Sequence, residues 1–154
     1  MNQAHIHLIV NHVPIVGSLF ALVLLGVGLL RKNETLTQAG LAAVLAAGLL
    51  CLPAQLTGEG AAQIVQDLPR VSRALIQAHE AAAELGFWAL ESAAALALFS
   101  LLLLKNASPK ARLLALLTLL ATALSFGLLA RAGNLGGQIR HTEIRDGFGT
   151  PDEL

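Results

Sequence analysis

Four long apolar runs dominate the sequence, and they place the chain among integral membrane proteins. The runs cover about residues 6–30, 36–56, 81–104 and 113–130. A helix needs roughly 20 residues to cross a hydrocarbon core of about 30 Å, and each run is close to that length. Only 13% of the residues are charged, about half the share that a soluble domain uses to cover its surface. We therefore expect an all-α integral membrane protein whose 154 residues form one domain.

The connections between the runs predict an antiparallel bundle of four helices. Residues 31–35 and 105–112 are short connections, and short loops join antiparallel neighbours. The first run contains Pro14 near its start, so its helix is expected either to begin there or to start earlier and bend.

The longer segment 57–78 is expected to form a helix of its own. Its apolar residues Ile64, Leu68, Val71 and Leu75 recur at helical spacing, as in an amphipathic helix. We expect a short helix that lies at the membrane interface and leads into the third span.

Charges near the ends of the runs predict the orientation. The two short connections together hold five Lys or Arg residues and one acid, whereas the opposite side holds five arginines and most of the acids. Since Lys and Arg in short loops favour the cytoplasm, we expect a multi-pass protein of the bacterial inner membrane with both termini periplasmic. The net charge is zero and no basic run occurs, so we expect no nucleic-acid partner.

The histidines and several acids gather at one expected end of the bundle. The first span opens with three histidines, the third is preceded by one and the fourth is followed by one. They are His5, His7, His12, His79 and His141. Because a metal or haem takes ligands from several directions, this end is the candidate site. Glu59 and Glu80 accompany the histidines as further candidate metal ligands. The alternative for each histidine is an ordinary solvated or backbone-bonded side chain.

Three carboxylates of the third span share one helical face. Glu80, Glu84 and Glu91 recur at helical spacing. Because a carboxylate is costly to bury unless it is protonated or paired, we expect this face to point into the bundle. It would form either a proton path or metal-ligand ladder, or ion pairs with arginines such as Arg131.

The fourth span carries two further features. Its polar stripe, which we expect to serve helix packing, consists of Thr118, Thr122 and Ser125. Beyond it, Gly136-Gly137 is expected to free the backbone so that His141 turns back over the bundle.

The order and spacing of these motifs carry a resemblance to a known family. The motifs are His7-x4-His12-x-Pro14-Ile15, the Thr57-Gly58-Glu59 turn, His79, and Gly136-Gly137-x-Ile139-Arg140-His141. Over nearly the whole chain they resemble a family of uncharacterised four-helix bacterial membrane proteins. That family is similar in plan to the small membrane b-type cytochromes, in which histidines from different helices ligate haem. Here the histidines lie near a single membrane face, which implies haem near that face and not a transmembrane two-haem wire.

The first functional hypothesis is therefore a b-type haem protein that transfers electrons and is not a stand-alone enzyme. Its partner would be a quinone or a periplasmic electron-transfer protein. His12 and His79 form the favoured axial pair because they lie on different helices near the same depth. The remaining candidates, as a second pair or as partners of the haem propionates, are His7, His141, Arg73 and Arg140.

Two other hypotheses remain open. The same histidines, with Glu59 or Glu80, would also suit a non-haem iron, copper or zinc ion. Alternatively, the chain is a structural subunit of a larger membrane complex or a homo-oligomer, because its second span is rich in the small residues that pack helices in membranes.

Overall fold

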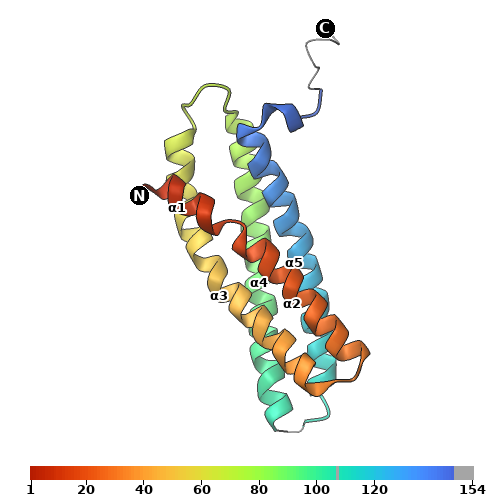
Figure 1. The fold of residues 1–154 in the computed structure, drawn as a ribbon. Coiled ribbons are helices and arrows are strands. Elements are labelled where there is room, and N and C mark those ends of the chain that lie inside the picture. Colours follow the sequence, from red (N-terminus) through yellow and green to blue (C-terminus); the bar gives the residue numbers. More distant parts are fainter. Residues whose placement is uncertain (107, 148–154) are drawn as a thin grey trace.

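The protein is a bundle of long helices that run side by side (Figure 1). The structure, a computed structural model, describes residues 1–106 and 108–147. Its elements are α1 (Gln3–Val10), α2 (Val13–Leu30), α3 (Glu34–Val65), α4 (Arg73–Lys105), α5 (Ala111–Arg140) and the 3-10 helix η1 (Thr142–Ile144). The described residues contain no strand. The all-α class is confirmed, and α1 and α2 together make up the first expected span.

Three helices, α1, α3 and α4, begin at residues whose side chains cap them, and the cap of α1 is Asn2. The side chain of Asn33 accepts a hydrogen bond from Leu36 N at 2.9 Å, and that of Ser72 accepts one from Leu75 N at 3.4 Å. Each bond satisfies an N–H group that has no partner within the helix. The α2–α3 and α4–α5 connections lie at one end of the bundle, which we call the loop end. The N-terminus, the end of the described chain at residue 147 and the α3–α4 connection lie at the other, which we call the histidine end (Figure 1).

Near the loop end, α2 and α3 pack with their backbones in contact. A Cβ atom on Gly28 would lie 2.6 Å from Thr37 N, and one on Gly40 would lie 2.5 Å from Leu25 Cα. Only glycine fits at such distances, and close approach of this kind is typical of helix pairs in membranes. Leu25 and Leu41 are fully buried in the resulting core.

The polar stripe of the fourth span lies inside the bundle, as predicted. Thr118, Thr122 and Ser125 are fully buried. Thr122 Oγ1 donates to Thr118 O at 2.8 Å, and Ser125 Oγ donates across the interface to Gly86 O of α4 at 3.4 Å. The hydroxyls are thus satisfied by backbone carbonyls, which agrees with a packing role.

The predicted short helix within residues 57–78 does not form, and this expectation was wrong. Instead, α3 continues to Val65 and α4 already begins at Arg73. The extension of α3 is supported by α1, which packs so closely that a Cβ atom on Gly60 would collide with the Gln3 side chain. Pro69 then interrupts the helical path, and Arg70 adopts a positive φ of 64°.

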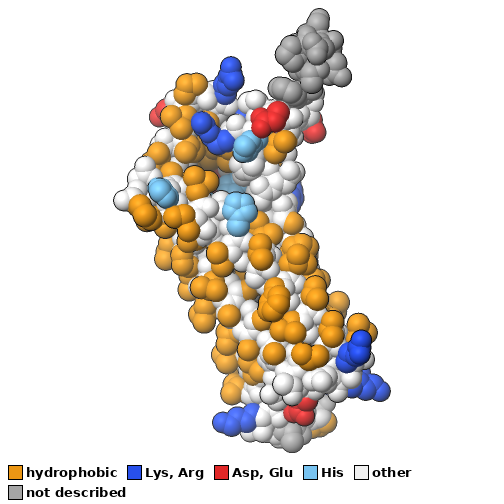
Figure 2. Space-filling view, viewed as in Figure 1, with side chains coloured by type: hydrophobic (Ala, Val, Ile, Leu, Met, Phe, Trp, Pro, Cys, Tyr) orange, Lys and Arg blue, Asp and Glu red, His pale blue; other side chains and the backbone are white. Residues whose placement is uncertain are grey.

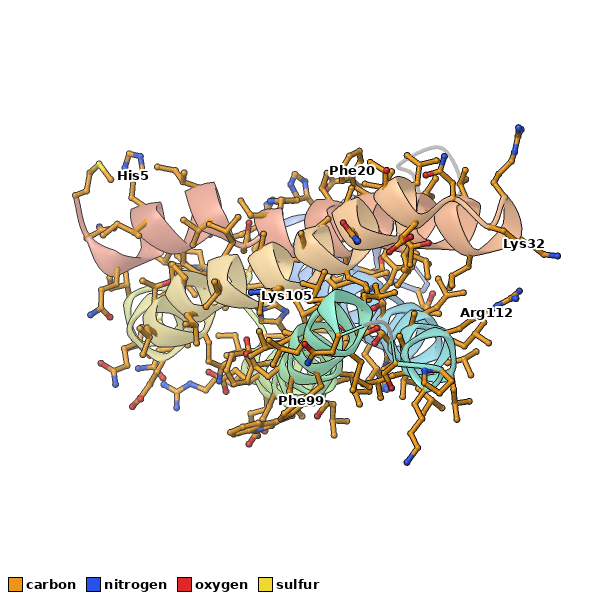
Figure 3. The ribbon with its side chains drawn as sticks, turned by 90° about the horizontal axis from the view of Figure 1, so that it is seen from below. His5, Phe20, Lys32, Phe99, Lys105 and Arg112 are labelled. Carbon is orange, nitrogen blue, oxygen red and sulfur yellow. The ribbon has the colours of Figure 1, made fainter. Side chains whose placement is uncertain are left out.

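Four helical segments are long and apolar enough to cross a membrane: α1 with α2, α3, α4 and α5. Hydrophobic side chains cover the middle of the visible surface (Figure 2). At the loop end, Lys32, Lys105 and Arg112 extend away from the bundle, while Phe20 and Phe99 point outward on opposite sides (Figure 3). These features are consistent with a multi-pass membrane protein.

Charged residues mark where the apolar surface ends on the histidine side. Gly86 of α4 packs against Leu129 of α5, so the antiparallel register places Glu84 and Arg131 at the same height. Both side chains are exposed. From this height toward the loop end, residues 85–104 of α4 extend over about 30 Å, which equals the thickness of a hydrocarbon core. We call the height of Glu84 and Arg131 the boundary level.

Candidate functional site

The first span is interrupted between α1 and α2, and its N-terminal part, α1, crosses the bundle. The Asn11 N–H still donates to His7 O at 2.8 Å, and α2 then restarts at Val13 with Pro14 in its first turn. A proline is favourable there because an N–H at that position would have no helical partner. Of the two expected alternatives, the helix therefore starts early and bends. As a result α1 crosses over α3 at the histidine end (Figure 1).

The side chain of His7 is held by α3. Its Nδ1 lies 3.1 Å from Ala54 O and 3.1 Å from Thr57 Oγ1. Since a carbonyl oxygen only accepts hydrogen bonds, Nδ1 carries the hydrogen and Nε2 of the neutral ring carries the lone pair. Thr57 is fixed in turn, because its hydroxyl donates to Pro53 O at 2.7 Å.

The side chain of His79 is held in the same way by α5. Its Nδ1 donates to Ala132 O at 2.8 Å. A Cβ atom on Gly136 would lie only 3.1 Å from two atoms of the imidazole ring. Gly136 and Gly137 both lie within α5, so the expectation that they turn His141 back over the bundle was wrong. The missing side chain of Gly136 instead makes room for the His79 ring.

These two anchored imidazoles come together although they lie far apart in the sequence. The ring centroids of His7 and His79 are 6.3 Å apart, and the ring planes are nearly perpendicular at 83°. Within the described part of the chain, neither Nε2 forms a hydrogen bond. His79 lies five residues outside Glu84, about 7.5 Å beyond the boundary level along α4. We call His7 and His79 the histidine pair.

Two other histidines of the N-terminal region lie outside this pair. The His12 side chain is exposed, forms no capping bond at the start of α2, and lies beside a shallow apolar hollow that includes Phe20. His5 is exposed and projects away from the bundle (Figure 3). The sequence favours His12 as the partner of His79, whereas the structure places His7 beside it.

His141 pairs with an acid beyond the end of α5. Its Nδ1 lies 2.9 Å from Glu143 Oε1, and both side chains are largely exposed. A hydrogen bond to its own backbone N–H, followed by the bond to His141, lowers the pKa of the Glu143 carboxyl below its ordinary value. His141 is therefore engaged at the surface and does not reach the histidine pair.

The other predicted ligands also lie at the surface of the histidine end. Arg73 is paired with Asp67 at 2.7 Å, and Arg140 is exposed. Glu59 accepts a hydrogen bond from Gln63 at 3.3 Å. In residues 1–106 and 108–147, no three His, Cys, Asp or Glu side chains are grouped so that they could hold a metal ion.

The glutamates of the third span do not all face the interior, which corrects the sequence-based expectation. Glu80 and Glu84 are exposed, while Glu91 is half-buried. The first two lie at or beyond the boundary level, where water and headgroups solvate a carboxylate. At the level of Glu91, α3 covers this face so closely that a Cβ atom on Gly48 would lie 2.7 Å from Ala94 Cβ.

Arg145 is a structural residue that the sequence did not point to. Its guanidinium donates to Gln138 O at 2.8 Å and to Ile139 O at 3.0 Å, the unpaired carbonyls at the end of α5. It also donates to Arg70 O in the α3–α4 connection at 3.0 Å. Basic residues near helix C-termini often bind such carbonyls, and Arg145 thereby ties two segments together above the histidine pair.

Comparison of the chain with protein-family models, curated proteins and solved structures gives no match. The resemblance to a four-helix membrane family therefore stays a prediction. The histidine pair offers two imidazole nitrogens with free lone pairs on α1 and α4, and the rings are anchored to α3 and α5. This donor set suits a metal with histidine ligands.

Proposed function

We propose that the protein is a membrane-embedded b-type haem protein that transfers electrons, and that His7 and His79 would hold its haem. The observation that carries the proposal is the anchoring of both Nδ1 atoms to backbone carbonyls. Metal-ligating histidines usually donate the other ring N–H to a carbonyl or carboxylate, which fixes the tautomer and orients the lone pair. Both members of the histidine pair have this arrangement.

The spacing of the two rings supports the same proposal. A metal–imidazole bond is about 2.0–2.1 Å long, so two imidazoles on opposite sides of one ion have centroids roughly 6 Å apart. The centroids of the histidine pair are 6.3 Å apart. Gly136 adds support, because any larger residue would press on the His79 ring.

The function follows from the ligand set. Two histidine ligands would leave a haem iron without an open coordination position, so the group would supply electron transfer and not conversion of a substrate. The residues of this chain orient the ligands, through Ala54 O and Thr57 for His7 and through Ala132 O for His79. Arginines at the histidine end, such as Arg140, are available to neutralise the haem propionates.

We further propose a location in the bacterial inner membrane, with the histidine end periplasmic. The loop end holds the short connections rich in Lys and Arg, which favour the cytoplasmic side. The histidine pair then lies at headgroup depth, where a quinone in the bilayer or a periplasmic redox protein can approach it.

The non-haem hypothesis has less support from the donor set. Zinc sites and most other non-haem metal sites take three or more protein ligands. The described residues bring together two imidazoles but no group of three candidate ligands. The structural-subunit hypothesis predicts a protein without any cofactor, and absorption spectroscopy distinguishes it from the others.

The test is the visible spectrum of the full chain, produced in a bacterial membrane with haem available and purified in detergent. We expect Soret and α bands that sharpen on reduction. His7→Ala and His79→Ala should each abolish them, whereas His5→Ala, a matched control on the same helix as His7, should retain them. His12→Ala should also retain them, which separates the histidine pair from the pair favoured by the sequence.

Other outcomes would overturn the proposal. A colourless protein with stoichiometric zinc, copper or iron would favour the non-haem hypothesis, and one without metal would favour a structural subunit. Haem that survives His7→Ala but is lost in His12→Ala would assign the ligand to His12.

A further inference from the structure

Two polar atoms inside the bundle lack a partner. Among the buried side-chain nitrogen and oxygen atoms of the described residues, only Asn11 Oδ1 and Glu91 Oε1 form no hydrogen bond. Such atoms are rare in folded proteins because an unmade buried hydrogen bond is unfavourable. They usually indicate bound water or a functional role.

Asn11 lies just inside the histidine pair. It is four residues after His7, and its N–H bonds to His7 O, so the two side chains share one face of the helix. Four residues further on, Ile15 packs against a buried cluster at the centre of the bundle. That cluster consists of Ala47, Cys51, Phe87, Leu90 and Leu129. The face that carries His7 and Asn11 therefore leads into the bundle interior.

Glu91 reaches the same interior from α4. Both of its carboxyl oxygens would lie 3.6 Å from a Cβ atom on Gly48 of α3. Glu91 is seven residues from Glu84, about 10 Å inside the boundary level, and so within the hydrocarbon layer. Asn11 lies one helical turn after His7, on the side of α2.

Among the described residues, no cation is paired with Glu91. The Cys51 thiol is the ionisable group that faces it from α3. The buried residues of α2 and α5 include no ionisable side chain, and the ion pairs of the described chain lie at the histidine end. An unpaired carboxylate in a membrane interior is strongly disfavoured relative to the neutral acid.

We propose that Glu91 is an internal proton-binding site, a neutral carboxylic acid that exchanges its proton with the histidine end through water held at Asn11. Water fits both unpartnered oxygens, because one molecule donates two hydrogen bonds and also accepts them. Gly48 contributes by leaving space beside the carboxyl group. The exchange is an acid–base reaction that requires no haem, so it stands or falls independently of the electron-transfer function.

Infrared spectroscopy of the full chain in phospholipid vesicles tests the protonation state. At neutral pH we expect a carboxylic-acid C=O band that is absent in Glu91→Gln. Glu84→Gln is the matched control, because Glu84 lies on the same helix but is exposed, and it should leave the band unchanged. If the wild-type protein has no such band, or if the band persists in Glu91→Gln, the proposal is overturned.

The rate of exchange with deuterium oxide tests the route. The band shifts when its proton is replaced by deuterium, and Asn11→Leu should slow this shift roughly tenfold, the effect of losing one hydrogen-bonded contact on the path. Asn134→Leu replaces an exposed asparagine of α5 and should exchange like the wild type. An unchanged rate in Asn11→Leu would overturn the route through Asn11.

A chemical probe covers the case in which Glu91→Gln does not fold. A lipid-soluble carbodiimide reacts with protonated carboxyl groups, so in the wild-type protein it should modify the peptide that contains Glu91, as identified by mass spectrometry. Absence of modification at Glu91, with modification of Glu84 alone, would contradict a neutral acid in the bundle.

Discussion

The two ends of the bundle hold their helices together in different ways. At the loop end, Gly28 and Gly40 allow the backbones of α2 and α3 to touch. At the histidine end, α1 leaves the line of α2, and side chains connect the helices through bonds to backbone carbonyls. Those bonds come from His7 to α3 and from His79 to α5.

The difference separates an end where backbones are close-packed from an end where anchored side chains keep polar atoms free. Backbone contact leaves no space and depends only on small residues. An imidazole that is hydrogen-bonded at one nitrogen keeps the lone pair of its other nitrogen free. The histidine end therefore retains two free nitrogen lone pairs that packing alone would not need. Substitutions at glycines of the two ends should therefore have different consequences.

The largest effect is expected for Gly40→Ala at the loop end. The added methyl group would lie 2.5 Å from Leu25 Cα, so α2 must move and the free energy of unfolding should fall by about 3 kcal/mol, the upper part of the range for overpacking. Denaturation in detergent measures this change. Gly127→Ala is the control, because no atom lies within 4 Å of its Cβ position. Equal destabilisation by both would show that the loop end is not close-packed.

A smaller and more specific effect is expected for Gly136→Ala at the histidine end. The methyl group would press on the His79 ring at 3.1 Å, at a cost of roughly 1 kcal/mol, and should lower the haem content per chain. Gly137→Ala, the neighbouring control, meets only the end of the Ile144 side chain at 3.4 Å and should keep the haem. The ratio of Soret to protein absorbance measures both. If Gly136→Ala and Gly137→Ala contain equal amounts of haem, the missing side chain of Gly136 does not contribute to haem binding at the histidine pair.

The sequence predicted the spans well but not the full helices. The apolar runs mark the parts that are long and apolar enough to cross a membrane, because length and hydropathy alone define these. The extensions beyond the apolar runs depend on other forces. For example, α4 begins at Arg73 instead of near residue 81, since Ser72 caps it and polar residues can continue a helix into the headgroup layer. A hydropathy profile does not detect these additional polar turns of the helix.

The sequence also predicted the end of the bundle at which the histidines gather (Figure 2), but not their partners. His7 and His12 are five residues apart, so on a helix their side chains point about 140° apart and only one can face the interior. The choice depends on how α1 packs on α3. That packing is set by Gly60, whose missing side chain admits Gln3, and no spacing rule reveals a contact between such distant residues.

The third prediction concerns the hydrogen bonds by which Arg145 connects the end of α5 to the α3–α4 connection. Arg145→Gln removes the bonds to Gln138 O, Ile139 O and Arg70 O, and local stability at the histidine end should fall by about 1 kcal/mol. Amide hydrogen exchange should accelerate at the end of α5 and in the α3–α4 connection, while the loop end stays protected. Arg140→Gln, an exposed neighbour, is the control. Faster exchange at both ends would mean that they are not independent.

The smallest effect is expected from the exposed His141–Glu143 pair. Because the pKa of folded Glu143 lies below its ordinary value, the pair stabilises the segment at pH values above the unfolded pKa of about 4.3, and this stabilisation is lost as the pH falls through the lower folded value. The contribution is small, since exposed pairs are screened by water and salt.

An NMR titration of the Glu143 carboxyl carbon should give a low midpoint that rises only in part in His141→Ala, because the bond to its own backbone N–H persists. An unchanged Glu143 midpoint in His141→Ala would show that His141 does not act on this carboxyl.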